Sequence, residues 1–190
     1  MNALIIVIAL GGDYFMQAER LKRSALQHGW QAEFVVVSDH PDGDVVVPSG
    51  GWDDVMEHYT NLERYIPESH DGPVVKLDAD TEAIGPEPVW GLHTIAGVNL
   101  CRNKVYTQPE LQPLTGVWLD GIVLDFKNKE YVNALTAQWR DEWARPDDVG
   151  QWGDLLSLRR IAAHIEIHAL DGDTKEPYPN SLAHHHTMHA

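Results

Sequence analysis

The chain has 190 residues, of which 43% are hydrophobic and 23% charged, a composition typical of one soluble globular domain with a substantial core. Its formal net charge of −15 disfavours nucleic acid as a partner, and its single cysteine, Cys101, excludes an internal disulfide. No apolar run approaches the roughly 20 residues of a membrane-spanning helix. We therefore expect a cytoplasmic protein with one domain, residues 1–190.

The first half of the chain alternates apolar strand-like runs with segments of helical periodicity. Gly29 follows the first helical segment as a typical terminator, and Pro67 ends the second. This order predicts an α/β fold in which helices flank a mostly parallel central sheet. The predicted elements are a strand at 3–10, a helix at 14–28, strands at 31–38 and 45–47, a helix at 53–66 and a strand at 73–77.

The second half is less regular, but it continues to mix strands and helices. The last twenty residues, 171–190, form a polar, histidine-rich tail. The predicted elements are strands at 95–100, 116–125 and 165–170, and helices at 129–143 and 154–164.

The strand at 73–77 leads directly into two aspartates, Asp78 and Asp80, with one small residue between them. Alternate residues of an extended chain project to the same side, so both carboxylates could reach one hard cation. Open α/β sheets bind ligands at the carboxyl ends of their strands. A Mn²⁺ or Mg²⁺ ion held there can bridge a diphosphate, and we predict a divalent-metal site at this position.

Two further aspartate pairs have the same spacing. Asp42 and Asp44 lie in a turn-like sequence, where short acidic side chains cap turns. Asp171 and Asp173 flank Gly172 in a sequence that suits a surface hairpin or loop. We favour a structural role for both of these pairs.

Two segments around the acidic pair carry a resemblance to a known family. The sequence YTNLERYIP at 59–67 and the sequence VVKLDADT at 74–81, with Trp90 after them, resemble the centre of metal-dependent nucleotide-sugar glycosyltransferases. These enzymes have the glycosyltransferase-A (GT-A) fold, and the likeness is to the glycogenin-like and galactosyltransferase group. Residues 118–124 lie where that group carries an Asn-Ser-Gly turn before an apolar strand.

The resemblance implies a GT-A glycosyltransferase that binds Mn²⁺ or Mg²⁺ and a nucleotide-diphosphate sugar, with a UDP-sugar as the expected donor. Asp78 and Asp80 would hold the metal and the diphosphate, and Arg64 would lie near the phosphates or nucleotide.

The loops after the first two strands would hold the nucleoside. By the same resemblance, Gly11 and Tyr14 would border the nucleoside, and Asp39 would lie near the base. Sequence patterns of P-loop and dinucleotide-binding sites are absent.

A histidine near the C-terminus commonly completes the metal site in this group, and here the candidates are His184, His185 and His186. Imidazole suits Mn²⁺, and because adjacent histidines point differently in a regular backbone, at most one or two of them can face the metal. We take His184 and His186 as the candidates. The alternative is a flexible terminus with no role in the site.

Asp120 and Asp154 are the candidate catalytic residues, as a general base or as ligands of the acceptor. Asp120 lies inside an apolar run, where an unpaired carboxylate is costly, and Asp154 is the aspartate that remains of an Asp-Gln-Asp type segment of the family. Their structural alternatives are a backbone-bonded strand residue and a helix cap.

Two other classes of protein remain open at this stage. A nucleotidyltransferase of similar fold should carry a longer glycine-rich loop with a basic residue after the first strand, which Gly11-Gly12-Asp13 lacks. A non-catalytic protein that binds a sugar nucleotide would bind the donor without turning it over.

Overall fold

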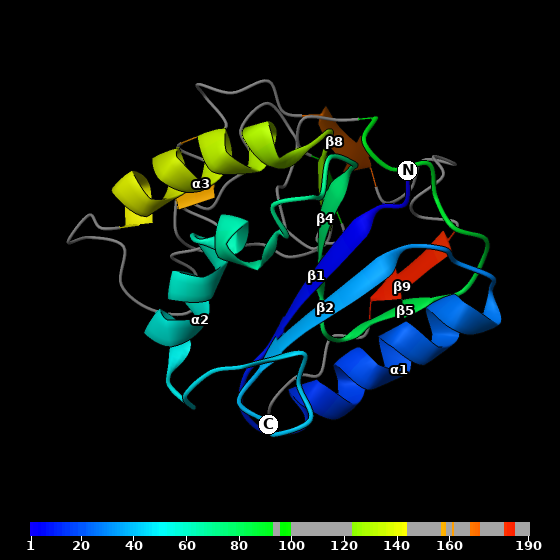
Figure 1. Cartoon of the computed structure of the whole chain (residues 1–190), viewed down its shortest axis with the longest axis horizontal. Helices are drawn as coiled ribbons and strands as arrows, with labels where there is room; N and C mark the ends of the chain where they lie inside the picture. The colour runs from blue at the N-terminus through cyan, green and yellow to red at the C-terminus, as the bar shows by residue number, and fades with distance from the viewer. Residues whose placement is uncertain are drawn as a thin grey trace.

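The apolar run near the N-terminus forms β1 (Leu4–Ala9), the middle strand of a five-stranded sheet (Figure 1). The structure is a computed structural model that describes residues 1–92, 96–99, 123–143, 157–158, 161, 168–171 and 181–184; at 96–99, 168–171 and 183–184 it describes only the backbone. The strand order is β3-β2-β1-β4-β7. The other strands of this sheet are β2 (Glu33–Ser38), β3 (Val45–Val46), β4 (Val74–Asp78) and β7 (Val123–Phe126).

The sheet is mixed, with one antiparallel pair at its edge. β1, β2, β3 and β4 pair in parallel, and β7 runs antiparallel to β4. The prediction of an α/β fold with a mostly parallel sheet is therefore confirmed. Of the strand predicted at 116–125, the described part begins at Val123, and residues 116–122 lie outside the described residues.

Helices cover both faces of the sheet. α1 (Tyr14–Gln27) lies on one face, and α2 (Trp52–Tyr59) and α3 (Lys129–Trp143) lie on the other (Figure 1). Every residue of β1 is buried, because its side chains point alternately into the two layers. The layer on the α1 side contains Ile5, Val7, Ala9, Phe15, Ala18 and Leu21, and the other contains Leu4, Ile6, Ile8, Met56, Val132 and Trp139.

Two small sheets complete the described part of the chain. β5 (Thr81–Ala83) pairs antiparallel with β9 (Leu182–His184), and β6 (Ala96–Asn99) pairs in parallel with β8 (His168–Asp171). Ala83 N–H donates to Ser24 Oγ at 3.0 Å, which attaches β5 to α1. Part of the polar tail is thus a strand, in contact with the segment that follows the acidic pair.

The helix predicted at 53–66 is wrong in its extent. α2 ends at Tyr59 and a separate 3₁₀ helix, η1 (Leu62–Tyr65), follows it. At the break, the Asn61 side-chain amide donates to Glu57 O at 2.6 Å, while the Asn61 backbone N–H donates to His58 O at 3.2 Å, so a side chain replaces the backbone donor of the next helical bond. By contrast, α3 has the predicted bounds.

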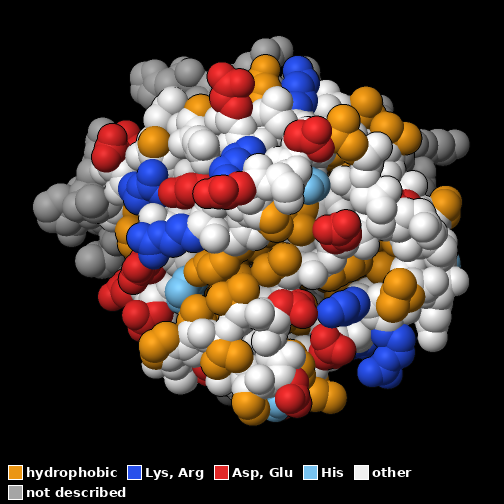
Figure 2. Space-filling view, viewed as in Figure 1, with side chains coloured by type: hydrophobic (Ala, Val, Ile, Leu, Met, Phe, Trp, Pro, Cys, Tyr) orange, Lys and Arg blue, Asp and Glu red, His pale blue; other side chains and the backbone are white. Residues whose placement is uncertain are grey.

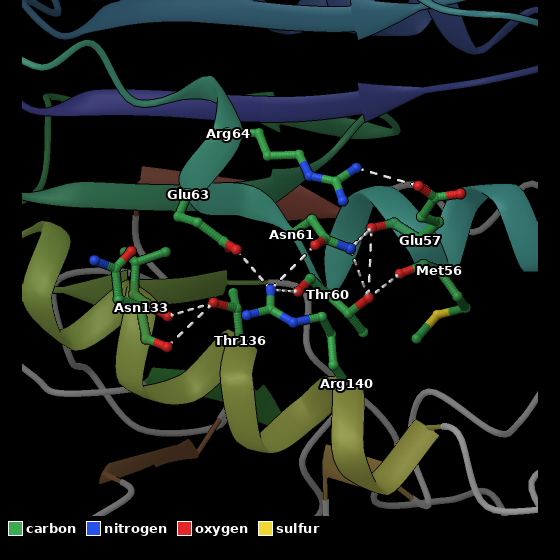
Figure 3. A network of polar contacts seen from close by, with 10 residues as sticks. Met56, Glu57, Thr60, Asn61, Glu63, Arg64, Asn133, Thr136 and Arg140 are labelled. Carbon is green, nitrogen blue, oxygen red and sulfur yellow. Dashed lines mark hydrogen bonds and ion pairs between the residues drawn. The ribbon is translucent and has the colours of Figure 1, made fainter.

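One arginine on α3 connects this helix to the break after α2 (Figure 3). Arg140 Nη1 donates to Thr60 O at 2.6 Å, to the Asn61 side-chain oxygen at 3.1 Å and to the Glu63 carboxylate at 2.6 Å. Thr60 and Asn61 are buried, so these acceptors have little access to water. Arg140 therefore fixes the direction in which the chain leaves α2 and approaches β4.

Acidic and basic side chains are interspersed over the face seen in Figure 2, where the described residues form no continuous basic surface. Within the described ranges, none of the helices has the length and apolar character needed to cross a bilayer.

Replacing Arg140 with methionine should destabilise the fold. The buried carbonyl of Thr60 and the Glu63 carboxylate lose a charged donor, and we expect a loss of about 2 kcal/mol in the free energy of unfolding. This corresponds to a drop of about 4–8 °C in Tm. Thermal and urea denaturation measure it. Arg64→Met is the matched control, because Arg64 forms an exposed pair with Glu57 and should cost less than about 1 kcal/mol; equal losses in both variants would contradict this role of Arg140.

Candidate functional site

The carboxyl ends of β1, β2 and β4 meet at one edge of the sheet. Ile8 of β1 is level with Val37 of β2 and with Asp78 of β4. The chain passes from β1 to β2 on one side and reaches β4 on the other side, so the strand order switches between β1 and β4. Such a switch point in an open α/β sheet leaves a crevice in which ligands bind.

The first loop at this edge is a short glycine turn. Gly11 and Gly12 have φ angles of 78° and 49°, which residues with a side chain rarely adopt. This conformation lets β1 pass into α1 within four residues. Tyr14 N–H donates to Gly11 O at 3.3 Å and begins the helix. The predicted nucleoside-binding residues Gly11 and Tyr14 therefore lie together at the edge.

Asp39, directly after β2, contacts this loop. Gly11 N–H lies 3.1 Å from Asp39 Oδ1 and 3.2 Å from Oδ2. Burial acts to raise the pKa of Asp39, but the hydrogen bonds from Gly11 N–H and the Ser49 side chain outweigh it, so the pKa lies below its ordinary value of 3.8. Asp39 is therefore an ionised acceptor beside Gly11.

An aromatic pair lies beside Asp39. The His40 ring stacks on the Phe15 ring, with centroids 4.1 Å apart and planes 7° from parallel. Sequence analysis missed this pair, because the two residues are 25 positions apart and only the fold brings the start of α1 beside the end of β2.

The acidic pair lies at the end of β4, next to β1. Asp78 is the last residue of β4, Asp80 lies in the turn before β5, and both are partly buried. The Lys76 ammonium group contacts the Asp78 carboxylate from the same face of the strand. Lys76 is only 4% exposed, and its Nζ lies 4.5 Å from the centre of the Tyr59 ring. This lysine is the main feature of the site that sequence analysis missed.

The tail approaches the acidic pair through strand pairing. In the β5–β9 register, His184 lies opposite Thr81, the residue that follows Asp80. This places the His184 backbone beside the end of the acidic turn. Its side chain, like the whole of His186, lies outside the described residues.

The remaining predicted residues are not gathered at this edge by any described contact. Arg64 is exposed on η1, and its guanidinium lies 3.1 Å from the Glu57 carboxylate (Figure 3). The candidate catalytic residues Asp120 and Asp154 lie outside the described residues.

The described side chains do not by themselves form a complete metal site. Among them, no three His, Cys, Asp or Glu side chains are grouped closely enough to hold a metal ion. Mg²⁺ usually takes one or two carboxylates and fills its shell with substrate phosphates and water. Asp78 and Asp80 offer carboxylate oxygens, which are donors suited to Mg²⁺ or Mn²⁺.

Comparison with known proteins assigns no family to the chain. No protein-family model matches it, and a search of curated proteins finds no significant match.

Asparagine at position 39 should weaken the fold in a pH-dependent way. Because folding lowers the pKa of Asp39, the ionised carboxylate stabilises the folded state above about pH 4, and this contribution is lost as the pH falls through the lowered pKa. We expect Asp39→Asn to lose about 1 kcal/mol at neutral pH and to approach the parent in acid.

Urea denaturation at neutral and acid pH measures this difference. Asp42→Asn is the control, since the Asp42 side chain is 80% exposed in the neighbouring turn. A deficit of Asp39→Asn that stays constant between the two pH values would contradict the assignment.

Proposed function

We propose that this chain is a metal-dependent glycosyltransferase of the GT-A fold, which transfers a sugar from a nucleotide-diphosphate sugar to an acceptor hydroxyl. A UDP-sugar is the proposed donor. The observation that carries the proposal is the position of Asp78 and Asp80 at the switch point of the sheet, beside the loops of Gly11 and Asp39.

The arrangement suits a donor that lies across the carboxyl ends of β2, β1 and β4. The ionised Asp39 carboxylate can accept a hydrogen bond from a base N–H, such as the imide of uracil. Asp78 and Asp80, one strand beyond β1, would bind the cation of the diphosphate. A divalent cation bound there would neutralise the charge that develops on the leaving diphosphate.

The pairing of β5 with β9 supports a role for the tail. Since the backbone of His184 is level with Thr81, the tail runs beside the acidic turn, and a tail histidine can supply the third protein ligand. This favours a functional tail over a terminus with no role, and His184 and His186 stay the proposed ligands.

A donor screen tests the proposal. Thermal shift with UDP-, GDP- and other sugar nucleotides, with and without Mn²⁺, should give stabilisation by one donor only when metal is present. At about 100 times Kd, binding adds about 2.7 kcal/mol, or about 5–11 °C in Tm. Asp80→Asn should abolish this shift, whereas Asp42→Asn, from another Asp-x-Asp pair, should keep it.

The outcome that rejects the transferase is binding of donor and metal by Asp78→Asn and Asp80→Asn as strongly as by the parent. Binding of the donor without transfer to any acceptor and without donor hydrolysis would instead identify a non-catalytic sugar-nucleotide-binding protein.

Asp120 and Asp154 are the proposed base or acceptor-binding residues. If one of them is the general base, its replacement by asparagine should lower turnover by about 10²–10⁴ while the donor still binds with parental affinity. Donor hydrolysis rates and thermal shifts separate the two effects. Parental turnover in both variants would remove them from the reaction.

A further inference from the structure

We propose that the ammonium group of Lys76, paired with Asp78, keeps the metal affinity of the free protein low. The divalent ion then binds together with a nucleotide diphosphate. This inference rests on the proposed function, because it concerns the cation and donor of that same site. Lys76 thereby acts as a positioning residue through Asp78.

The location of Lys76 requires a charged partner. It lies in the middle of β4, between Ile6 of β1 and Leu124 of β7, and is 4% exposed. A buried ammonium group without compensation is costly, so it needs an anion within reach. Asp78, two residues further along the same face of the strand, is that anion.

A second contact fixes the ammonium group from the helix side. Lys76 Nζ lies over the ring of Tyr59, which provides a favourable cation–π contact. Tyr59 in turn stacks on Trp139 of α3, with centroids 6.3 Å apart and planes 5° from parallel, and the Trp139 indole donates to Ser157 Oγ at 2.8 Å. The Lys76 side chain packs against Tyr59 of α2, and Tyr59 packs against Trp139 of α3, so the ammonium group stays in contact with Asp78 in the absence of a ligand.

The charge of the lysine changes what the acidic pair can bind. Two carboxylates carry a charge of −2, but with the ammonium group the three side chains sum to −1. A divalent ion on Asp78 would share that carboxylate with a second positive charge, which repels it at short range. A diphosphate brings both negative charge and additional oxygen ligands, and so it offsets the repulsion between the divalent ion and the ammonium group. Metal and nucleotide should therefore increase each other's affinity by the same factor.

Methionine at position 76 isolates the charge, because it is also unbranched and fits an apolar setting. Mn²⁺ titration of the metal-free protein without nucleotide, read by the electron paramagnetic resonance signal of the free ion, measures metal affinity directly. We expect Lys76→Met to bind Mn²⁺ at least about tenfold more tightly than the parent. Lys76→Arg, which keeps the charge, should stay as weak as the parent, and Asp78→Asn added to Lys76→Met should remove the gain. Lys22→Met, from the Lys22–Asp44 pair, whose side chains are 34% and 42% exposed, is the matched control.

The results separate this inference from the proposed function. Equal Mn²⁺ affinity of Lys76→Met and the parent overturns the role of Lys76, whichever nucleotides bind. If Lys76→Met gains Mn²⁺ affinity but no sugar nucleotide stabilises the parent, the effect of the lysine on the metal is supported and the transferase is rejected. If Lys76→Met does not fold, Mn²⁺ binding to the parent is measured with and without UDP. Equal Mn²⁺ affinity overturns the coupling between metal and nucleotide, and a rise of at least about tenfold with UDP supports it.

Discussion

The parallel register of β1 with its two neighbours is the constraint on which the rest of the structure depends. β1 is buried on both faces, and its hydrogen-bonded register brings the ends of β2 and β4 to the same level. The loops that follow are therefore adjacent in space, although Gly11, Asp39 and Asp78 are separated by tens of residues in the chain. The candidate site is a consequence of this register, because Gly11 and Asp39 follow β1 and β2 at the same edge at which β4 ends with Asp78.

Two charged groups at this edge have compensating partners. Asp39 is compensated by Gly11 N–H and Ser49, and Lys76 by Asp78 and the Tyr59 ring. The first arrangement leaves an ionised acceptor beside a loop, and the second leaves a carboxylate that is already paired with an ammonium group. The proposed nucleobase position therefore offers an ionised hydrogen-bond acceptor, whereas the proposed metal position contains a carboxylate that is paired with a lysine.

The elements that sequence analysis predicted well are those whose local pattern and packing agree. α3 runs from Lys129 to Trp143 as predicted, since the face it buries repeats with helical spacing. The helix predicted at 53–66 was wrong in its extent because its end depends on Asn61, whose side-chain amide bonds back to a helix carbonyl, and on Arg140, about eighty residues further along. No window of sequence around Thr60 contains that arginine.

The sequence by itself determined the α/β alternation and the two aspartates at the end of a buried strand, because hydrophobic periodicity and the residues that follow an apolar run are local properties. Only the tertiary structure decided that β7 joins β4 antiparallel, that Thr81 lies opposite His184, and that Lys76 reaches Asp78 beneath Tyr59. These contacts join segments that are distant in the chain, or depend on which face of a strand is covered. The physical reason is that strand pairing and the burial of a charged side chain depend on all the segments that pack around them, because a buried charge is stable only beside a compensating group.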